Sequence, residues 1–380
     1  MPTTVTTKTS WLSRIGSSIK GIFIGIVLVI LAGILLFWNE GRAVKTYQSF
    51  KEGASKVVSV PNDPVDSTKE GALIHFTGEA KTPSVLVDTD FGVGGNLLKL
   101  KRVVEVYQWE ENTASKTVDK LGGGQETTTT YTYAQDWSEV LSDSSKFQEA
   151  EAHRNPTAKL FESQEFFAQN VSVGSFLLPD EILRTLPGYS TFEITSEMLT
   201  SLPLDKQSKL EILGNMLYYQ TENPTTPVIG STRIRYEAIA PQKVSVIAQQ
   251  KGNSLAPYQT KNGRTIEMIQ VGEIPAAQMF AGAIEANKTM TWIVRVVGLI
   301  LLFLGFRMAL GVLPILAGVI PPLGKLIGAG ASLVSFLLAM LIGVVIIAIA
   351  WISARPLIGI LLLASVIGVF FLYLKFKKSK

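Results

Sequence analysis

The chain of 380 residues contains no cysteine and only two histidines, His75 and His153. Without cysteine there is no disulfide, no thiolate metal site and no thiol nucleophile. The histidines belong to no HExxH or comparable pair, so the sequence predicts no metal and no cofactor. No nucleophile-elbow pattern supports a Ser-His-Asp site, although such residues need only meet in space. We therefore assign no catalytic residue, and we expect His75, in an apolar run, to be structural.

Acidic residues are absent from both ends of the chain. All 31 lie between Glu40 and Glu285, whereas Lys and Arg occur throughout. The ends are therefore basic as well as apolar, and the middle is mildly acidic. Because of this acidity, the run of residues 98–102 (LKLKR) is read as a strand with one wet face, and no nucleic-acid partner is expected.

Four apolar runs are long enough to cross a bilayer as helices. They are residues 19–38, 292–313, 332–351 and 356–374. The alternative for the first run is a cleaved signal peptide, but it is too long for a signal core and no small-x-small site precedes Asn39. Pro314, Pro321 and Pro322 divide the second run from the third. We expect residues 314–331 to form an interfacial or re-entrant segment.

The middle of the chain, residues 39–291, is typical of an α+β domain with mostly antiparallel sheet. Strand-like runs at 97–109 and 127–133 flank three glycines, which predicts a long hairpin with a mobile tip. A helix is predicted from Pro275 to Met290 and into the next apolar run. The Thr-rich first ten residues are expected to be disordered. The predicted fold is therefore α+β, with four transmembrane helices and a large, β-rich extracytosolic domain between spans one and two.

The Lys and Arg residues of short loops and tails predict which side of the membrane each part occupies. The tails, residues 1–18 and 375–380, are basic, and Lys325 lies between spans two and three. These parts are assigned to the cytosolic side. Residues 39–291 are then periplasmic or lumenal.

One set of candidate residues lies where the first two spans meet the domain: Trp38, Asn39, Glu40, Arg42, Trp292 and Arg295. The two tryptophans suit a membrane interface. An arginine inside the membrane is costly alone, and Glu40 is the acid nearest to Arg295 in depth. We therefore expect Glu40 and Arg295 to pair and to clamp the two spans together.

Two further sets concern packing and lipid. Small residues in the spans permit close helix contacts, and we expect Gly21, Gly25, Gly298 and Gly305 to support self-association. Cations without a local carboxylate are expected to contact anionic lipid: Arg307, Lys325, Lys375, Lys377 and Lys378.

Six stretches resemble, in the same order, those of the LUMA family of four-span membrane proteins. They are residues 37–46 (FWNEGRAVKT), 73–78 (LIHFTG), 98–109 (LKLKRVVEVYQW), 155–158 (NPTA), 244–252 (VSVIAQQKG) and 292–295 (WIVR). The resemblance implies the four-span layout and no established catalytic residue. The animal member resides in the endoplasmic reticulum and inner nuclear membrane and is regarded as an organiser of membrane protein complexes that contacts lamins and emerin.

Relatives of this family occur in bacteria, and the lack of cysteine and the Thr-rich tail fit such a member. A bacterial inner membrane with a periplasmic domain is therefore favoured. The alternative is the endoplasmic reticulum or inner nuclear membrane with a lumenal domain.

Two functions stay open at this point. The favoured one is a non-enzymatic membrane scaffold that organises protein complexes through oligomerisation and its extracytosolic domain. Its partners would be anionic lipids, copies of itself and other membrane or envelope proteins. The alternative is an envelope enzyme or transporter accessory that acts on lipid or cell-wall material, which would require titratable groups converging in a concave site.

Overall fold

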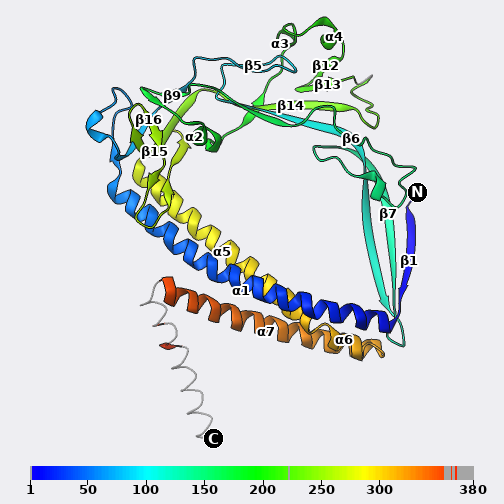
Figure 1. The fold of residues 1–380 in the computed structure, drawn as a ribbon. Helices are drawn as coiled ribbons and strands as arrows, with labels where there is room; N and C mark the ends of the chain where they lie inside the picture. Colours follow the sequence, from blue (N-terminus) through cyan, green and yellow to red (C-terminus); the bar gives the residue numbers. More distant parts are fainter. Residues whose placement is uncertain (1, 221–222, 355–360, 362–363, 366–380) are drawn as a thin grey trace. The chain divides into compact units, whose positions relative to one another are not determined.

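The computed structural model describes residues 2–220, 223–354, 361, 364 and 365, and its chain divides into two compact units (Figure 1). The β-rich unit comprises Met1–Thr3, Glu52–Ala114 and Thr130–Phe280. The helical unit comprises Thr4–Lys51, Ser115–Thr129 and Ala281–Lys380. The predicted fourth span, 356–374, and the tail 375–380 with Lys375, Lys377 and Lys378 lie outside the described residues.

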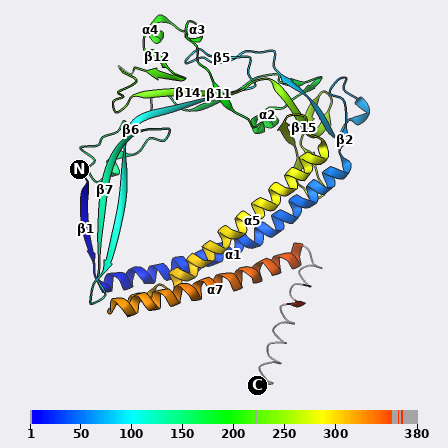
Figure 2. The same ribbon diagram turned by 180° about the vertical axis from the view of Figure 1, so that it is seen from behind.

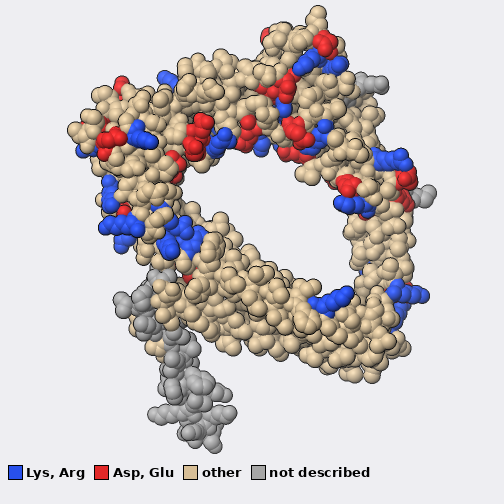
Figure 3. All heavy atoms as spheres, viewed as in Figure 1, with Lys and Arg blue, Asp and Glu red and all other residues tan. Residues whose placement is uncertain are grey.

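Three long apolar helices dominate the helical unit, and each is long enough to cross a membrane. They are α1 (Trp11–Lys56), α5 (Ala276–Ala309) and α7 (Pro321–Ala354), with the short α6 (Val312–Ala317) between the last two. Both ribbon views show α1, α5 and α7 running side by side (Figure 2). Buried Ala32, Leu36, Leu302 and Ala339 form their shared core. Figure 3 shows this part almost entirely in the colour of uncharged residues.

The helix boundaries differ from the predicted spans. Helix α1 continues to Lys56, well beyond the expected end at Trp38, because residues 39–56 contain no proline. Helix α7 begins at Pro321 rather than at residue 332, since proline is tolerated in a first helical turn. The segment 314–331 is therefore mostly helical. The predicted continuity of the helix after Pro275 with the next apolar run is confirmed by α5.

The glycines of the apolar runs bring α1 and α5 together within one chain. A Cβ added at Gly25 would lie 2.5 Å from the backbone oxygen of Gly305, and one at Gly305 would lie 2.7 Å from Val29. A Cβ at Gly298 would lie 2.5 Å from Leu36, whereas one at Gly21 meets only a backbone oxygen at 4.0 Å. We expected these glycines to serve contacts between copies. In the structure Gly25, Gly298 and Gly305 lie in a contact between two helices of one chain, and their part in contacts between copies stays a prediction.

The strands form two main sheets, as the sequence predicts for an α+β class. The larger has the order β1-β7-β6-β14-β13-β12, with β11 beside β14 and β8 beside β6. The smaller has the order β10-β9-β3-β15-β16, with β19 beside β15 and β2 beside β3. Their central pairs, β6 with β14 and β3 with β15, are antiparallel.

The strand bounds are as follows: β1 Thr3–Thr9, β2 Val58–Ser59, β3 Leu73–Lys81, β4 Leu86–Asp88, β5 Val93–Gly95, β6 Lys99–Asp119, β7 Gln125–Ser138, β8 Gln164–Phe167, β9 Ser172–Val173, β10 Phe176–Leu177, β11 Ser190–Phe192, β12 Leu210–Leu213, β13 Met216–Tyr219, β14 Thr232–Ile239, β15 Gln242–Lys251, β16 Ser254–Ala256, β17 Tyr258–Gln259, β18 Thr265–Ile266 and β19 Met268–Val271. Short helices α2 (Asp180–Thr185), α3 (Ser196–Leu199) and α4 (Leu204–Gln207) connect some of them.

Two apolar clusters form the core of the β-rich unit. One gathers around Phe76, Phe176 and Val246 of the smaller sheet. The other gathers around Phe91, Leu100 and Tyr236 of the larger sheet. Alternation along β14, in which every second residue from Thr232 to Ala238 is buried, places one face of this strand on that core.

The predicted long hairpin is confirmed, but its tip is held rather than free. The tip Gly122 donates its N–H to the carbonyl of Val319 at 3.1 Å, and Arg14 donates to the carbonyl of Gly123. Trp11 donates its indole N–H to the carbonyl of Ile315 at 2.9 Å. All of these contacts lie within the helical unit.

Most of the Thr-rich tail that was expected to be disordered, Thr3–Thr9, forms strand β1 beside β7. The backbone groups of an isolated Thr-rich tail would all bond water, but β7 offers them a partner edge. The sidedness predicted from the Lys and Arg residues puts Arg14 on the cytosolic side and Gly123 on the other. Residues in contact cannot lie on opposite sides of a bilayer, so these two assignments cannot both hold.

Candidate functional site

A buried carboxylate joins the three apolar helices. Glu40 lies in α1 and is 2% exposed. Arg295 of α5 donates to both of its oxygens, from Nε at 2.6 Å and from Nη2 at 2.8 Å. Trp351 of α7 donates its indole N–H to Oε2 at 2.6 Å. The structure thus contains the expected ion pair, in a bidentate geometry that is among the stronger charge-assisted interactions.

A second group of polar side chains continues this contact along α1 and α5. Asn39 is fully buried and donates to the carbonyl of Thr291 at 3.1 Å. Arg42 donates to the side-chain oxygens of Asn39 at 3.1 Å, Asn287 at 3.1 Å and Thr291 at 3.2 Å. Asn287 in turn donates to the carbonyl of Ala43 at 3.0 Å. Each polar group on one helix therefore has its partner on the same or the facing helix.

The aromatic residues of the set have different positions. The Arg295 guanidinium lies 4.8 Å from the ring centre of Trp292 and 5.7 Å from that of Trp351, in range of cation–π attraction. Trp38 and Trp292 are both 57% exposed. We call Glu40, Arg295, Trp351, Asn39, Arg42, Asn287 and Thr291 the polar clamp. Of the six residues predicted here, Asn39, Glu40, Arg42 and Arg295 belong to it, Trp292 flanks it and Trp38 faces outward.

The prediction lacked three members of the clamp, Asn287, Thr291 and Trp351, and Trp351 was read only as the end of a span. An indole N–H inside an apolar helix needs an acceptor, and this was the available signal. Both oxygens of Glu40 accept hydrogen bonds from clamp members, so the clamp holds helices together rather than presenting a free acid or base. Removing one partner of such a buried pair typically costs about 3–5 kcal/mol.

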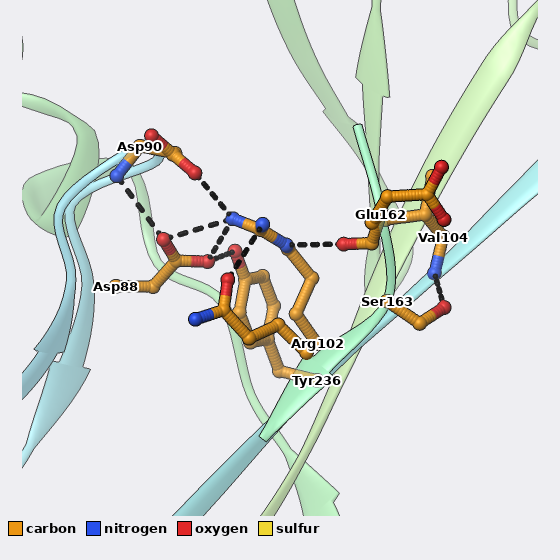
Figure 4. A network of polar contacts seen from close by, with 8 residues as sticks. Asp88, Asp90, Arg102, Val104, Glu162, Ser163 and Tyr236 are labelled. Carbon is orange, nitrogen blue, oxygen red and sulfur yellow. Dashed lines mark hydrogen bonds and ion pairs between the residues drawn. The ribbon is translucent and has the colours of Figure 1, made fainter. Parts of the chain in front are cut away.

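The β-rich unit contains a comparable network (Figure 4). Asp88 and Arg102 are 1% and 3% exposed, and the Arg102 Nη1 lies 2.8 Å from Asp88 Oδ2. The same nitrogen lies 2.8 Å from Asp90, which is half exposed. The Tyr236 hydroxyl donates to Asp88 at 2.7 Å. Burial, and then the neighbouring Asp88 carboxylate, raise the pKa of this hydroxyl.

We expected the run LKLKR to be a strand with one wet face, and this expectation is wrong. Lys99 and Arg102 are both buried. Lys99 donates to the carbonyl oxygens of Arg184 at 2.9 Å and Leu186 at 3.3 Å. Paired and hydrogen-bonded cations can be buried, because their partners replace the water that burial removes.

The two histidines and the acidic residues show no arrangement typical of a metal centre. Within the described residues, no three His, Asp or Glu side chains gather as metal ligands. His75 bonds Ser59 at 3.1 Å and the carbonyl of Ile274 at 2.9 Å. Burial lowers the pKa of His75. These contacts hold β3 against its neighbours and are those of a structural histidine.

One cleft of the β-rich unit has paired carboxylates. It encloses about 540 Å³ and is lined in part by Glu181, Lys251, Ser254 and Glu267. The Oε1 atom of Glu267 is buried and has no hydrogen-bond partner among the described residues. Burial and the nearby Glu181 raise the pKa of Glu267.

The predicted lipid-contact residues that the structure describes, Arg307 and Lys325, lie at the other end of the helices from the polar clamp. They line a separate cleft together with Arg14.

Three apolar helices are joined by a polar clamp, and the β-rich unit is inserted in the sequence between the first two. This is the architecture of an integral membrane protein. The family description "Transmembrane protein 43" matches residues 106–356. The chain belongs to this family, which confirms the family that its motifs indicate.

Its relatives align over most of their length. Human Transmembrane protein 43 is 30% identical over 369 residues, which cover 93% of this chain and 89% of the relative. The mouse protein is 30% identical over 94% of this chain and 91% of its own length. The Drosophila melanogaster homolog is 30% identical over 89% of this chain and 90% of its own length. No solved structure matches.

Proposed function

We propose that this protein is a non-enzymatic membrane scaffold, which organises membrane protein complexes through self-association and through a domain outside the cytosol. The polar clamp is the observation that carries the proposal. Its carboxylate, guanidinium, amide and indole groups bind one another across three helices. Such an arrangement fixes helix positions, which a scaffold requires.

The outward faces of the helices supply surface for partners. Phe23, Ile30 and Ile34 of α1, Val296 of α5 and Leu341 of α7 are each about half exposed or more. In a membrane these side chains meet lipid, other membrane proteins or a second copy. Because Gly25 and Gly305 are used within the chain, we propose that self-association uses these outward faces instead.

Single-cysteine crosslinking in native membranes tests self-association, since the wild-type chain supplies a cysteine-free background. The variants Ile34→Cys, Val296→Cys and Leu341→Cys each place one thiol on an outward face. We expect at least one of them to form a disulfide-linked dimer under mild oxidation. Ala32→Cys is the matched control, because Ala32 is fully buried and should not crosslink. If the three outward-facing variants also remain monomeric, the proposal of self-association through these faces is wrong.

Thiol labelling tests the proposed sidedness with the same background. Lys261→Cys reports on the β-rich unit, Lys20→Cys on the start of α1 and Lys120→Cys on the hairpin tip, and all three side chains are exposed. The tip touches the start of α1, so we expect an impermeant maleimide to label Lys20→Cys and Lys120→Cys from the same side. Labelling of Lys261→Cys from the extracytosolic side supports an extracytosolic domain, and labelling only from the cytosolic side would contradict it.

The cleft with Glu181 and Glu267 favours one second candidate, an envelope enzyme. A carboxyl group with a raised pKa beside a second carboxylate can act as a general acid. If this candidate holds, purified protein will convert a membrane lipid or cell-wall fragment, and Glu267→Gln will abolish the product seen by mass spectrometry. Under the scaffold proposal the wild type and Glu267→Gln give the same product profile.

A further inference from the structure

A basic cleft lies in the helical unit where α5 ends and α7 begins. It encloses about 520 Å³. Basic side chains line it from three helices: Arg14 of α1, Arg307 in the last turn of α5 and Lys325 near the start of α7. Among its described lining residues Asp119 of the hairpin tip is the only acid.

Two of the three cations have no partner among the described residues. Asp119 lies 3.7 Å from Arg14, which also donates to the carbonyl of Gly123. Within the described part of the chain, Arg307 and Lys325 have neither an ion pair nor a hydrogen bond, and Arg307 is only partly exposed. The sequence beyond Glu285 contains no Asp or Glu. The cleft therefore has an excess of positive charge that the described side chains do not neutralise.

The helix ends sharpen this imbalance. The negative end of the α5 dipole stabilises Arg307, so this residue alone would need no ligand. Lys325 lies at the opposite kind of end, because it follows Pro321 by four residues in the 34-residue α7. The start of a helix has a positive partial charge, which disfavours a cation and favours an anion. An anion between Arg307 and Lys325 would remove this conflict.

The surroundings of the cleft indicate what carries the anion. Large apolar side chains on α6 and α7 are exposed beside it: Leu313, Leu316, Leu323 and Leu326. We propose that the cleft binds the phosphate group of an anionic phospholipid, whose acyl chains lie along these leucines. Arg307 and Lys325 then form a defined headgroup site with Arg14, rather than part of a diffuse basic surface.

Native mass spectrometry of the full chain in neutral detergent tests this site. The probes are phosphatidylglycerol, phosphatidylcholine and inorganic phosphate. We expect phosphatidylglycerol to bind about tenfold more tightly than phosphatidylcholine, as charge-assisted contacts to one headgroup would give. Lys325→Gln should weaken this preference and Arg307→Gln/Lys325→Gln should remove it. Lys20→Gln is the matched control, because Lys20 is exposed on α1 but does not line the cleft.

Several outcomes would overturn the proposal. One is equal binding of the two lipids by the wild type. Another is a loss of preference in Lys20→Gln as large as that in Lys325→Gln, because it would show a diffuse effect of charge. Competition by inorganic phosphate at the lipid's own concentration would identify a free anion as the ligand instead. Arg307→Lys is a control for misfolding of the variant Arg307→Gln/Lys325→Gln. It keeps the positive charge and should keep most of the preference for phosphatidylglycerol.

Discussion

The two units bury the same chemical combination in different surroundings. Each has a carboxylate, an arginine and an aromatic hydrogen-bond donor: Asp88, Arg102 and Tyr236 in one, and Glu40, Arg295 and Trp351 in the other. In the β-rich unit Arg102 has a second carboxylate, the half-exposed Asp90, which connects the network to water. In the helical unit Glu40 is the only carboxylate that Arg295 contacts among the described residues.

The difference teaches how each unit tolerates buried charge. The acid-rich middle of the chain offers a replacement partner near its surface, whereas the apolar helices offer none. Loss of Glu40 would therefore leave Arg295 without a counter-ion, and loss of Asp88 would leave Arg102 with Asp90.

The largest expected effect is on the helical pair. Glu40→Arg and Arg295→Glu should each lower the stability of the protein in mild detergent by about 3–5 kcal/mol, because each leaves a buried charge without a partner. The double exchange should recover part of the loss, and thermal unfolding of all four proteins measures it. Strictly additive losses would show that the two residues act separately.

A smaller effect is expected in the β-rich unit. Asp88→Asn should cost about 2–3 kcal/mol, because it weakens the bonds to both Arg102 and Tyr236 while Asp90 remains. Asp90→Asn is the matched control and should cost less than about 1 kcal/mol, since its side chain is half exposed. Chemical unfolding curves of the two variants compare them. Equal costs would contradict the idea that Asp90 acts as the reserve partner.

A third test separates close helix packing from the polar clamp. Gly25→Ala would place a methyl group 2.5 Å from the backbone oxygen of Gly305, which cannot move aside without separating α1 from α5. We expect a loss of about 1–3 kcal/mol. Gly41→Ala is its control in the same helix: nothing lies within 4 Å, so it should be neutral or stabilise by up to about 1 kcal/mol. We expect the melting temperature in detergent to fall for Gly25→Ala and to stay unchanged or rise for Gly41→Ala.

The smallest expected effect is a gain in stability. The pKa of Glu267 is raised in the folded chain, so its protonated form fits the fold better. The resulting stabilisation is complete below its ordinary value of 4.5 and is lost as the pH rises through the raised pKa. Glu267→Gln should therefore stabilise the protein at pH 7, by about 1 kcal/mol or less, and should have little effect near pH 4. A gain that is independent of pH would exclude titration of Glu267 as its cause.

Sequence reasoning succeeded where few partners were possible. The apolar runs predicted the long helices, and the scarcity of acids near them left Glu40 as the partner of Arg295. It failed for the Asp88 network, because Asp88 and Tyr236 are 148 residues apart and 31 acids compete for pairing. Strand register places Tyr236 opposite Arg102, but Asp88 lies in β4 of a separate sheet, and only tertiary packing brings it to them.

Other features depend on contacts that composition does not specify. A small residue predicts a close approach but not whether the neighbour is the same chain or a copy, so the contact of Gly25 with Gly305 within one chain could not be foreseen. The Thr-rich tail and the Gly-rich tip each lack internal constraints, and sequence reasoning gave no sign that they order each other and the start of α1. The predicted sidedness was in part inconsistent for this reason.

The long sequence separation within the polar clamp has a consequence for biosynthesis. Arg295 follows Glu40 by 255 residues, and Trp351 follows it by 311. At a synthesis rate of about 5–20 residues per second, Glu40 exists for roughly 13–50 seconds before Arg295 has been made. During that time the first helix carries a carboxylate whose partner does not yet exist. The nascent chain must keep Glu40 in contact with water, or with another protein, until α5 arrives, so final seating of α1 is a late event in assembly.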